Sequence, residues 1–291
     1  MKVRRDGLLV LDKPPGLTST QALSQAKRQL RALKGGHTGT LDPLATGVLV
    51  LCFGEATKVA PFLLDADKRY RVVIGLGVST TTYDAQGEIT LQQPVQTDRE
   101  QVARWLSDFV GDIEQVPPRF SAIKKEGVRF YERARKGDLQ TPPSRRVRID
   151  RIDIVALEGA DLTLDVTCGK GVYVRSLAHD LGARLGCGGH VKALQRLAVA
   201  GFTIDEAVAL ADVTEQTPLV PGDHALRHLP AVELPPLLAV AVCKGQAVHI
   251  EGAASGPVRL YDANRRFVGV GTVGADGSIR PTRLWCAGGS G

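Results

Sequence analysis

Short apolar blocks separated by turns rich in Gly and Pro make up the first part of the chain. The apolar run Leu8–Leu11 predicts a buried strand, which ends at the turn around Pro14-Pro15-Gly16. A helix capped by Thr18 or Ser19 is expected next, and Gly35-Gly36 is expected to end it. Its inward stripe would consist of Leu23, Ala26, Leu30 and Leu33.

The middle of the chain mixes both periodicities. Residues 69–77 predict a buried strand, and residues 98–111 predict a helix. The inward residues of that helix would be Val102, Trp105, Leu106 and Phe109. Residues 146–157 and 161–168 alternate like a hairpin, and residues 173–185 predict another helix. Because strands and helices do not alternate as regular βαβ units, we expect an α+β fold with a mixed, largely antiparallel sheet.

The pattern changes after about residue 214. Prolines mark a connector at positions 218, 221, 230, 235 and 236. Beyond it the sequence predicts only strands and turns, with strands at residues 237–242, 258–261, 267–273 and 279–285. We therefore divide the chain into a larger domain, residues 1–232, and a small all-β domain, residues 233–291.

Composition narrows the function classes. The 291 residues carry a net charge of +6, which favours a polyanionic partner only weakly, and the 43% apolar content excludes global disorder. The five cysteines are scattered, with no C-x-x-C pair, so we expect reduced thiols and no metal site. The charged N-terminus resembles no secretory signal and no apolar run is long enough to span a bilayer. These features predict a cytoplasmic protein with no membrane partner.

Basic residues gather in one segment, residues 117–148. Ten Lys and Arg face only three acidic residues between positions 119 and 148, with Phe120, Phe130 and Tyr131 interleaved. This mixture suits phosphate contacts and base stacking, although a solvated charged loop has a similar composition. We interpret the segment as a candidate RNA contact.

The most informative segment is Gly36–Gly47, which reads GHTGTLDPLATG. An isolated Asp42-Pro43 would usually be a turn former, because an Asp carboxylate caps nearby backbone N–H groups. The complete run, however, closely resembles the signature loop G-H-T-G-x-L-D-P-x-A-T-G of the TruB-type pseudouridine synthases. That resemblance makes Asp42 a candidate catalytic residue.

The resemblance extends from about Leu8 to Thr203. It is carried by the segments Leu11–Gly16, Asp67–Tyr70, Gly75–Gly87 with its G-x-x-T-x-T-x-D-x-x-G spacing, Pro117–Lys124, Cys168–Leu177 and Gly188–Leu194. A weaker match links the C-terminal part to the PUA-type RNA-binding module. Three positions depart from the family pattern: Phe120, Val172 and Gln195 stand where the family commonly has Tyr, Thr and Arg.

Family membership would imply a cofactor-free enzyme that isomerises a uridine in the T arm of tRNA, uridine 55, to pseudouridine. Asp42 would be the nucleophile and Arg175 its ionic partner. Tyr70 would be the third catalytic residue, stacking on the target base and helping to remove its C5 proton. Tyr173 and Leu194 resemble the pocket walls. The domain at residues 1–232 would then be the catalytic domain, residues 117–148 its RNA-gripping insertion, and residues 233–291 a PUA-like domain. We expect tRNA as partner and a monomer.

Two further residues take their roles from the resemblance alone. His37 matches the loop histidine that fills the space left by the flipped base, and Lys13 matches a lysine that would support the active-site loop. Taken without the family, each residue has an ordinary explanation: a solvent-exposed loop His, a surface Arg at 175, a half-buried strand Tyr at 70 or a core Leu at 194.

The reaction explains why a carboxylate is needed. Pseudouridylation breaks the N1–C1′ bond, turns the uracil and rejoins it through C5, so no redox cofactor or energy source is required. A carboxylate could add at C6 or act through C1′, and the sequence leaves both routes open. The target base must be flipped out of the folded RNA to reach it. Two rival interpretations are an RNA-binding protein without catalysis and a DNA-binding regulator, but no helix-turn-helix or zinc pattern supports the second.

Overall fold

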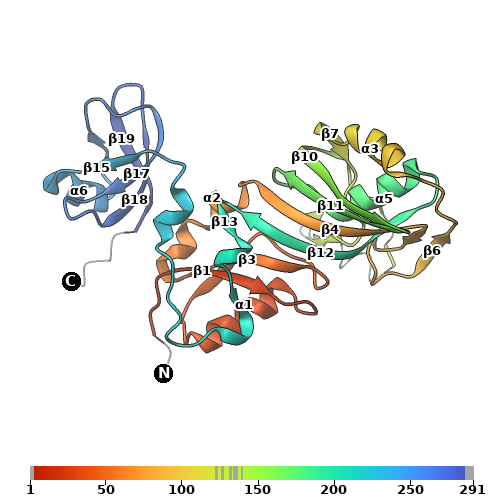
Figure 1. The fold of residues 1–291 in the computed structure, drawn as a ribbon. Helices are drawn as coiled ribbons and strands as arrows, with labels where there is room; N and C mark the ends of the chain where they lie inside the picture. The colour runs from red at the N-terminus through yellow and green to blue at the C-terminus, as the bar shows by residue number, and fades with distance from the viewer. Residues whose placement is uncertain are drawn as a thin grey trace.

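The computed structural model describes residues 3–121, 124, 125, 128–130, 133, 137, 138 and 140–285. Within these residues the chain forms two units, each built on its own sheet (Figure 1). The larger unit has a ten-stranded sheet with helices packed on it, and the smaller C-terminal unit has a five-stranded sheet. The predicted α+β class is confirmed.

The large sheet has the order β14-β1-β3-β12-β4-β11-β10-β7. These strands are β14 (Val208–Ala209), β1 (Gly7–Lys13), β3 (Thr46–Phe53), β12 (Gly189–Val199), β4 (Lys68–Leu76), β11 (Asp161–Cys168), β10 (Arg145–Glu158) and β7 (Gly111–Gln115). Two short strands lie off this path, β2 (Gly35–Thr38) on β3 and β13 (Phe202–Thr203) on β12. Only the β1–β14 and β12–β3 pairs are parallel, so the sheet is mixed and largely antiparallel as predicted.

Three helices cover one face of this sheet. They are α1 (Ser19–Gln29), α3 (Arg99–Ser107) and α5 (Val174–Arg184). Their apolar residues share one core with that face. The opposite faces of β1 and β3 pack against η1 (Gly54–Lys58), α2 (Ala60–Leu64) and η4 (Gly222–Leu226) in a second core. Two further 3₁₀ turns, η2 (Ile204–Glu206) and η3 (Leu210–Asp212), lie between β13 and the connector.

The first helix ends earlier than the sequence predicted. Thr18 caps α1 with a capping box, and the helix ends at Gln29 because Arg31 adopts a left-handed backbone with φ 53°. The chain therefore leaves the helical path before the glycine pair. Leu33, assigned to the inward stripe, is 55% exposed, so that assignment was wrong.

The C-terminal sheet has the order β15-β17-β18-β19-β16. Its strands are β15 (Ala231–Glu233), β17 (Gly256–Tyr261), β18 (Phe267–Val273), β19 (Ser278–Leu284) and β16 (Val248–His249). Residues 237–242, predicted as a strand, instead lie in helix α6 (Pro236–Cys243). A six-residue apolar run is ambiguous by periodicity, and Pro236 at the first helical position together with two alanines favours the helix. Cys243 is disulfide-bonded, contrary to the expectation of reduced thiols, whereas Cys52, Cys168 and Cys187 are free.

The C-terminal sheet is anchored to the larger unit through apolar contacts. Val270 and Trp285 join the second core, and the Lys58 Nζ donates a hydrogen bond to the Leu284 carbonyl at 2.8 Å. The Trp285 ring lies so close to Gly222 that a Cβ there would come within 2.3 Å of it. The indole therefore requires glycine at the start of η4.

Candidate active site

The loop between β2 and β3 carries Asp42, shortly before β3 begins at Thr46. The segment predicted as a loop is shorter than expected, because Gly36–Thr38 pairs with β3 and Thr46 already begins that strand. Gly47 has φ +93°, and a Cβ there would lie 2.3 Å from the Arg196 carbonyl. The N-terminus of α1 holds the loop, since the Leu41 N–H donates to Ser19 Oγ at 2.8 Å.

Arg175 is the centre of the ion pairs around Asp42. Its Nε lies 2.9 Å from Asp42 Oδ2, and its Nη1 lies 3.4 Å from Asp84 Oδ2. The remaining donors reach the carbonyls of Thr82 at 3.1 Å and Phe120 at 2.9 Å. The guanidinium is thus held from four sides. Because Phe120 contributes only its backbone here, the departure from the family Tyr does not affect this contact.

A cavity of about 290 Å³ opens beside this ion pair. Five of the residues singled out from the sequence line it together: Asp42, Tyr70, Tyr173, Arg175 and Leu194. They come from separate elements, namely the β2–β3 loop, β4, the start of α5 and β12. Carboxylate, guanidinium, aromatic ring and apolar wall therefore face one space of a size suited to a single base.

Two predicted residues do not line the cavity. Lys13 is fully buried, and its Nζ donates to the carbonyls of Pro14 at 2.8 Å and Leu17 at 2.6 Å. Burial lowers the pKa of Lys13 to about 8, although the nearby Asp42 charge opposes this shift. His37 lies in β2, and its buried Nδ1 has no hydrogen-bond partner among the described residues. Burial, reinforced by Arg196, lowers the pKa of His37.

The electrostatic state of the cavity is a balance of burial and charge. Burial raises the pKa of Asp42, and Asp84 adds to the rise, whereas Arg175 and Lys13 oppose it. Burial also raises the pKa of the Tyr70 phenol, and the Arg196 guanidinium opposes that rise most strongly. The cationic groups therefore keep both oxygen acids closer to ionisation than burial alone would.

Sequence reasoning did not assign roles to Asp84 and Arg196. Asp84 is buried, and its Oδ1 accepts from Thr82 Oγ1 at 2.6 Å and from the Gln86 N–H at 3.0 Å. It stood in the recognised Gly75–Gly87 motif, which was the available signal. Arg196 follows Leu194 by two residues and therefore lies on the same face of β12. Because Leu194 was a predicted cavity residue, this alternation was a signal for Arg196 as well.

The basic segment 117–148 lies partly outside the described residues, including Tyr131, Arg135 and Lys136. Its described strands are β8 (Lys124–Lys125) and β9 (Val128–Arg129), which form a two-stranded ribbon. Near its C-terminal end two arginines are paired with carboxylates from other segments. Arg146 contacts Asp112 at 3.1 Å, and Arg148 contacts Asp67 at 2.8 Å.

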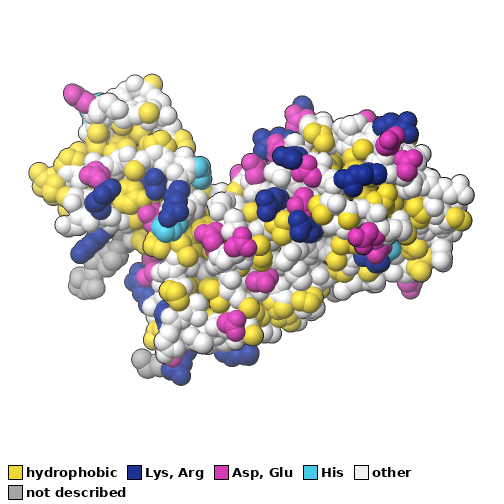
Figure 2. All heavy atoms as spheres, in the orientation of Figure 1, with side chains coloured by type: hydrophobic (Ala, Val, Ile, Leu, Met, Phe, Trp, Pro, Cys, Tyr) yellow, Lys and Arg dark blue, Asp and Glu magenta, His cyan; other side chains and the backbone are white. Residues whose placement is uncertain are grey.

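Charge is consequently mixed on the visible surface. On the face shown in Figure 2, Lys and Arg are interspersed with Asp and Glu over the larger unit. Lys170 also pairs with Asp65 at 3.0 Å, beside the Arg148–Asp67 pair, in a groove that adjoins the candidate cavity at Gly169. The excess of basic residues counted along the sequence is therefore partly neutralised in space.

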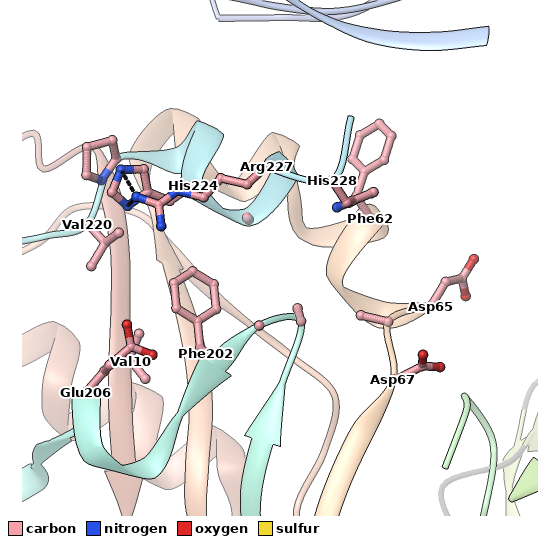
Figure 3. Close-up of a pocket in the computed structure, with 15 residues that line it drawn as sticks. Val10, Phe62, Asp65, Asp67, Phe202, Glu206, Val220, His224, Arg227 and His228 are labelled. Carbon is pink, nitrogen blue, oxygen red and sulfur yellow. Dashed lines mark hydrogen bonds between the residues drawn. The ribbon is translucent and has the colours of Figure 1, made fainter. Parts of the chain in front are cut away.

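A second cavity, of about 800 Å³, lies between α2, β13 and η4 (Figure 3). His224 and Arg227 are joined by a hydrogen bond of 2.9 Å on one side, and Asp65 and Asp67 lie at another. None of the residues singled out for catalysis lines it. Although it is larger, it lacks the carboxylate–guanidinium pair of the first cavity, so the smaller cavity is the candidate active site.

The described residues contain no group of three or more His, Cys, Asp or Glu side chains placed to hold a metal ion. No helix among them is long and apolar enough to cross a membrane.

Comparison with known proteins identifies the class. Residues 27–174 match the N-terminal domain model of the TruB family of pseudouridylate synthases. Residues 175–229 match the tRNA pseudouridylate synthase B C-terminal domain, and residues 230–285 match the C-terminal model of pseudouridine synthase II TruB. The fold is thus that of a pseudouridine synthase. Within that class, the chain belongs to the TruB family.

Individual relatives agree along the whole length. The chain is 46% identical to tRNA pseudouridine synthase B of Stutzerimonas stutzeri (strain A1501) and 45% identical to that of Pseudomonas aeruginosa (strain UCBPP-PA14), each over 97% of both chains. Among solved structures it resembles a Cbf5-Nop10-Gar1 complex chain, with 25% identity, a TM-score of 0.73 and coverage of 96% of this chain and 85% of that one. A chain of an H/ACA RNP bound to a substrate RNA containing 2′-deoxyuridine has 24% identity, a TM-score of 0.75 and coverage of 97% and 85%, which shows a shared fold.

Proposed function

We propose that this protein converts uridine 55 in the T arm of tRNA to pseudouridine, with Asp42 as nucleophile toward a flipped-out base. The observation that carries the proposal is the Asp42–Arg175 pair at 2.9 Å in a base-sized cavity walled by Tyr70, Tyr173 and Leu194. The relatives named tRNA pseudouridine synthase B support tRNA as the substrate.

The overall reaction balances without a co-reactant. The N1–C1′ bond of the uridine breaks, a C5–C1′ bond forms, C5 loses its proton and N1 gains one. The Asp42 carboxylate can add to C6 of the base or act at C1′ of the sugar, and either route requires it to be ionised. Arg175 and Lys13 favour that ionised form against the effect of burial.

The other residues of the cavity have supporting roles in this proposal. Tyr70 stacks on the uracil, with Tyr173 and Leu194 forming the walls that exclude water. His37 fills the space that the base leaves in the RNA, and Lys13 supports the loop that carries Asp42. The insertion at residues 117–148 and the C-terminal unit, residues 233–291, hold the tRNA, and the protein acts as a monomer in the cytoplasm.

The test compares the wild-type protein with Asp42→Asn on a T-arm stem-loop. We expect the wild type to form pseudouridine, also in EDTA, because the proposed chemistry uses no metal. Asp42→Asn should form none and should bind the RNA within about tenfold of wild type, ~1.4 kcal/mol, because recognition is spread over many contacts. A stem-loop with cytidine at position 55 should give no product.

Asp165→Asn is the matched control, since Asp165 is also paired with an arginine, Arg71, at 2.8 Å but lies on the exposed side of β11. It should retain wild-type turnover. Pseudouridine formation by Asp42→Asn would show that Asp42 is a turn residue. Circular dichroism of each variant separates a loss of chemistry from a loss of fold.

A further inference from the structure

The side chain of Arg196 is a buried cation beside the proposed active site. It is 1% exposed and belongs to the largest fully buried side chains of the protein. Its Nε donates to the Val48 carbonyl at 2.6 Å and its Nη2 to the Gly39 carbonyl at 3.1 Å. Among the described residues no carboxylate forms an ion pair with Arg196, so its charge is met by the two backbone carbonyls and by the Tyr70 hydroxyl rather than by an anion. Burying a charge without an ionic partner is energetically unfavourable, because the charge loses its hydration and gains no opposite charge in return.

The position of Arg196 connects two parts of the site. Its two backbone acceptors belong to the start of the loop that carries Asp42 and to strand β3, into which that loop leads. Arg175 holds the same loop through the Asp42 carboxylate, at 2.9 Å. Two arginines therefore fix the loop: Arg196 binds the backbone of the loop at Gly39, and Arg175 binds the side chain of Asp42.

The other contact of Arg196 is with Tyr70. The two residues are direct partners in the antiparallel ladder between β12 and β4, and both line the catalytic cavity. Side chains at such opposed positions lie on one face with Cβ atoms about 5 Å apart. The guanidinium consequently directs a positive charge toward the Tyr70 phenol, in agreement with its opposition to the raised pKa of that group.

We propose that Arg196 is a positioning residue for the isomerisation, which fixes the turn leading to Asp42 and at the same time presents a positive charge to the hydroxyl of Tyr70. Its role would be to keep the carboxylate and the phenol in register on the two sides of the base. The proposal rests on the proposed function, since it concerns the same cavity, but its electrostatic part can be tested without turnover.

The kinetic test uses Arg196→Lys and Arg196→Met under single-turnover conditions on the T-arm stem-loop. Lysine keeps the charge but cannot reproduce the planar fork, so we expect a rate about tenfold lower; methionine removes the charge and should lower it about a hundredfold. The dissociation constant for the RNA should change less than about threefold in both, because Arg196 is enclosed. Arg71→Lys and Arg71→Met are the matched controls, since Arg71 adjoins Tyr70 in β4 but is exposed and paired with Asp165.

The electrostatic test follows the phenol directly. Fluorotyrosine replaces the five tyrosines, the signal of position 70 is assigned by its loss in Tyr70→Phe, and ¹⁹F NMR follows its titration. We expect the midpoint to rise by about one pH unit or more in Arg196→Met and less in Arg196→Lys, because a cation favours the phenolate. The Arg71 variants should leave it unchanged.

The outcomes are distinguishable. Wild-type rates in both Arg196 variants, or an unshifted Tyr70 midpoint, would overturn the positioning role. If the wild-type protein forms no pseudouridine, the proposed function fails while the titration still decides whether Arg196 acts on Tyr70. If Arg196→Met does not fold, Arg196→Lys decides the question: a reduced rate with unchanged RNA affinity supports the proposal, and a wild-type rate refutes it.

Discussion

Removing the positive charge of Arg175 should move the acid limb of the activity profile to higher pH. The Arg175 Nε lies 2.9 Å from Asp42 Oδ2, a separation at which two unit charges attract by about 6 kcal/mol at an effective dielectric constant of ~20. The Asp42 side chain is 37% exposed, so solvent screens part of this attraction, and we take about half of it. About 3 kcal/mol corresponds to roughly a hundredfold in the equilibrium between the ionised and protonated carboxyl, so the loss of Arg175 should raise the pKa of Asp42 further.

Arg175→Met should therefore lose most of its activity at neutral pH and recover part of it as the pH rises and Asp42 ionises. The stability of this variant should follow the opposite trend. An aspartate whose folded-state pKa exceeds its unfolded value of about 3.9 binds protons more tightly when folded, so stability is highest in acid and falls as the pH rises toward the folded pKa. A rate that rises with pH together with a stability that falls with pH would indicate that no cation compensates the charge of Asp42 in this variant.

The assay is single-turnover pseudouridine formation between about pH 5 and pH 9, with thermal unfolding at each pH. Arg184→Met is the matched control, because Arg184 lies on the same helix and pairs with Asp108 at 2.6 Å but is exposed. It should keep the wild-type acid limb. Arg175→Lys retains the positive charge and should shift the acid limb less than Arg175→Met does. It also serves as the test if Arg175→Met does not fold. An acid limb within about half a pH unit of wild type in the Lys and Met variants would refute the reasoning.

Two further predictions follow from the surface and from the join between the units. Asp65→Asn combined with Asp67→Asn should raise RNA affinity severalfold and steepen its salt dependence, because both carboxylates neutralise cations in the groove beside the cavity. Filter binding at several salt concentrations measures both quantities. An equal effect of Asp108→Asn combined with Asp161→Asn would show that the change in net charge alone is responsible. Trp285→Ala should lower stability by about 2 kcal/mol, measured by denaturant unfolding, because its ring fills the contact between the two sheets. An unchanged midpoint would mean that the indole carries no packing energy there.

Some features were determined locally and could be predicted from the sequence. The hairpin of β10 and β11 was predicted because alternation along each strand is itself the requirement for burying one face. The N-terminus of α1 was predicted because the capping interactions of Thr18 involve residues three positions away. The candidate residues around Asp42 came from motifs in which the family resemblance gave the residue types and their spacing.

Other features depended on segments that are distant in the sequence. The strand expected at residues 237–242 is a helix, because an apolar run satisfies both periods and only its packing partners decide between them. The basic segment was counted as ten cations against three anions, yet Arg146 and Arg148 find carboxylates at Asp112 and Asp67, outside the segment. Whether a charge is neutralised depends on which side chains lie next to it in the folded protein, and a count of charges along the sequence does not show this.

By itself, the sequence determined the α+β class, the strands and helices with strong periodicity, and the residue types that the chemistry needs. Only the tertiary structure decided how the two arginines are held. Asp84, a partner of Arg175, is 91 residues away from it in the sequence, and Arg196 binds Gly39 across 157 residues. The physical reason is that a buried charge is stable only where the completed fold supplies its partners. Those partners come together when the strands of the sheet pair, so no local pattern in the chain contains them.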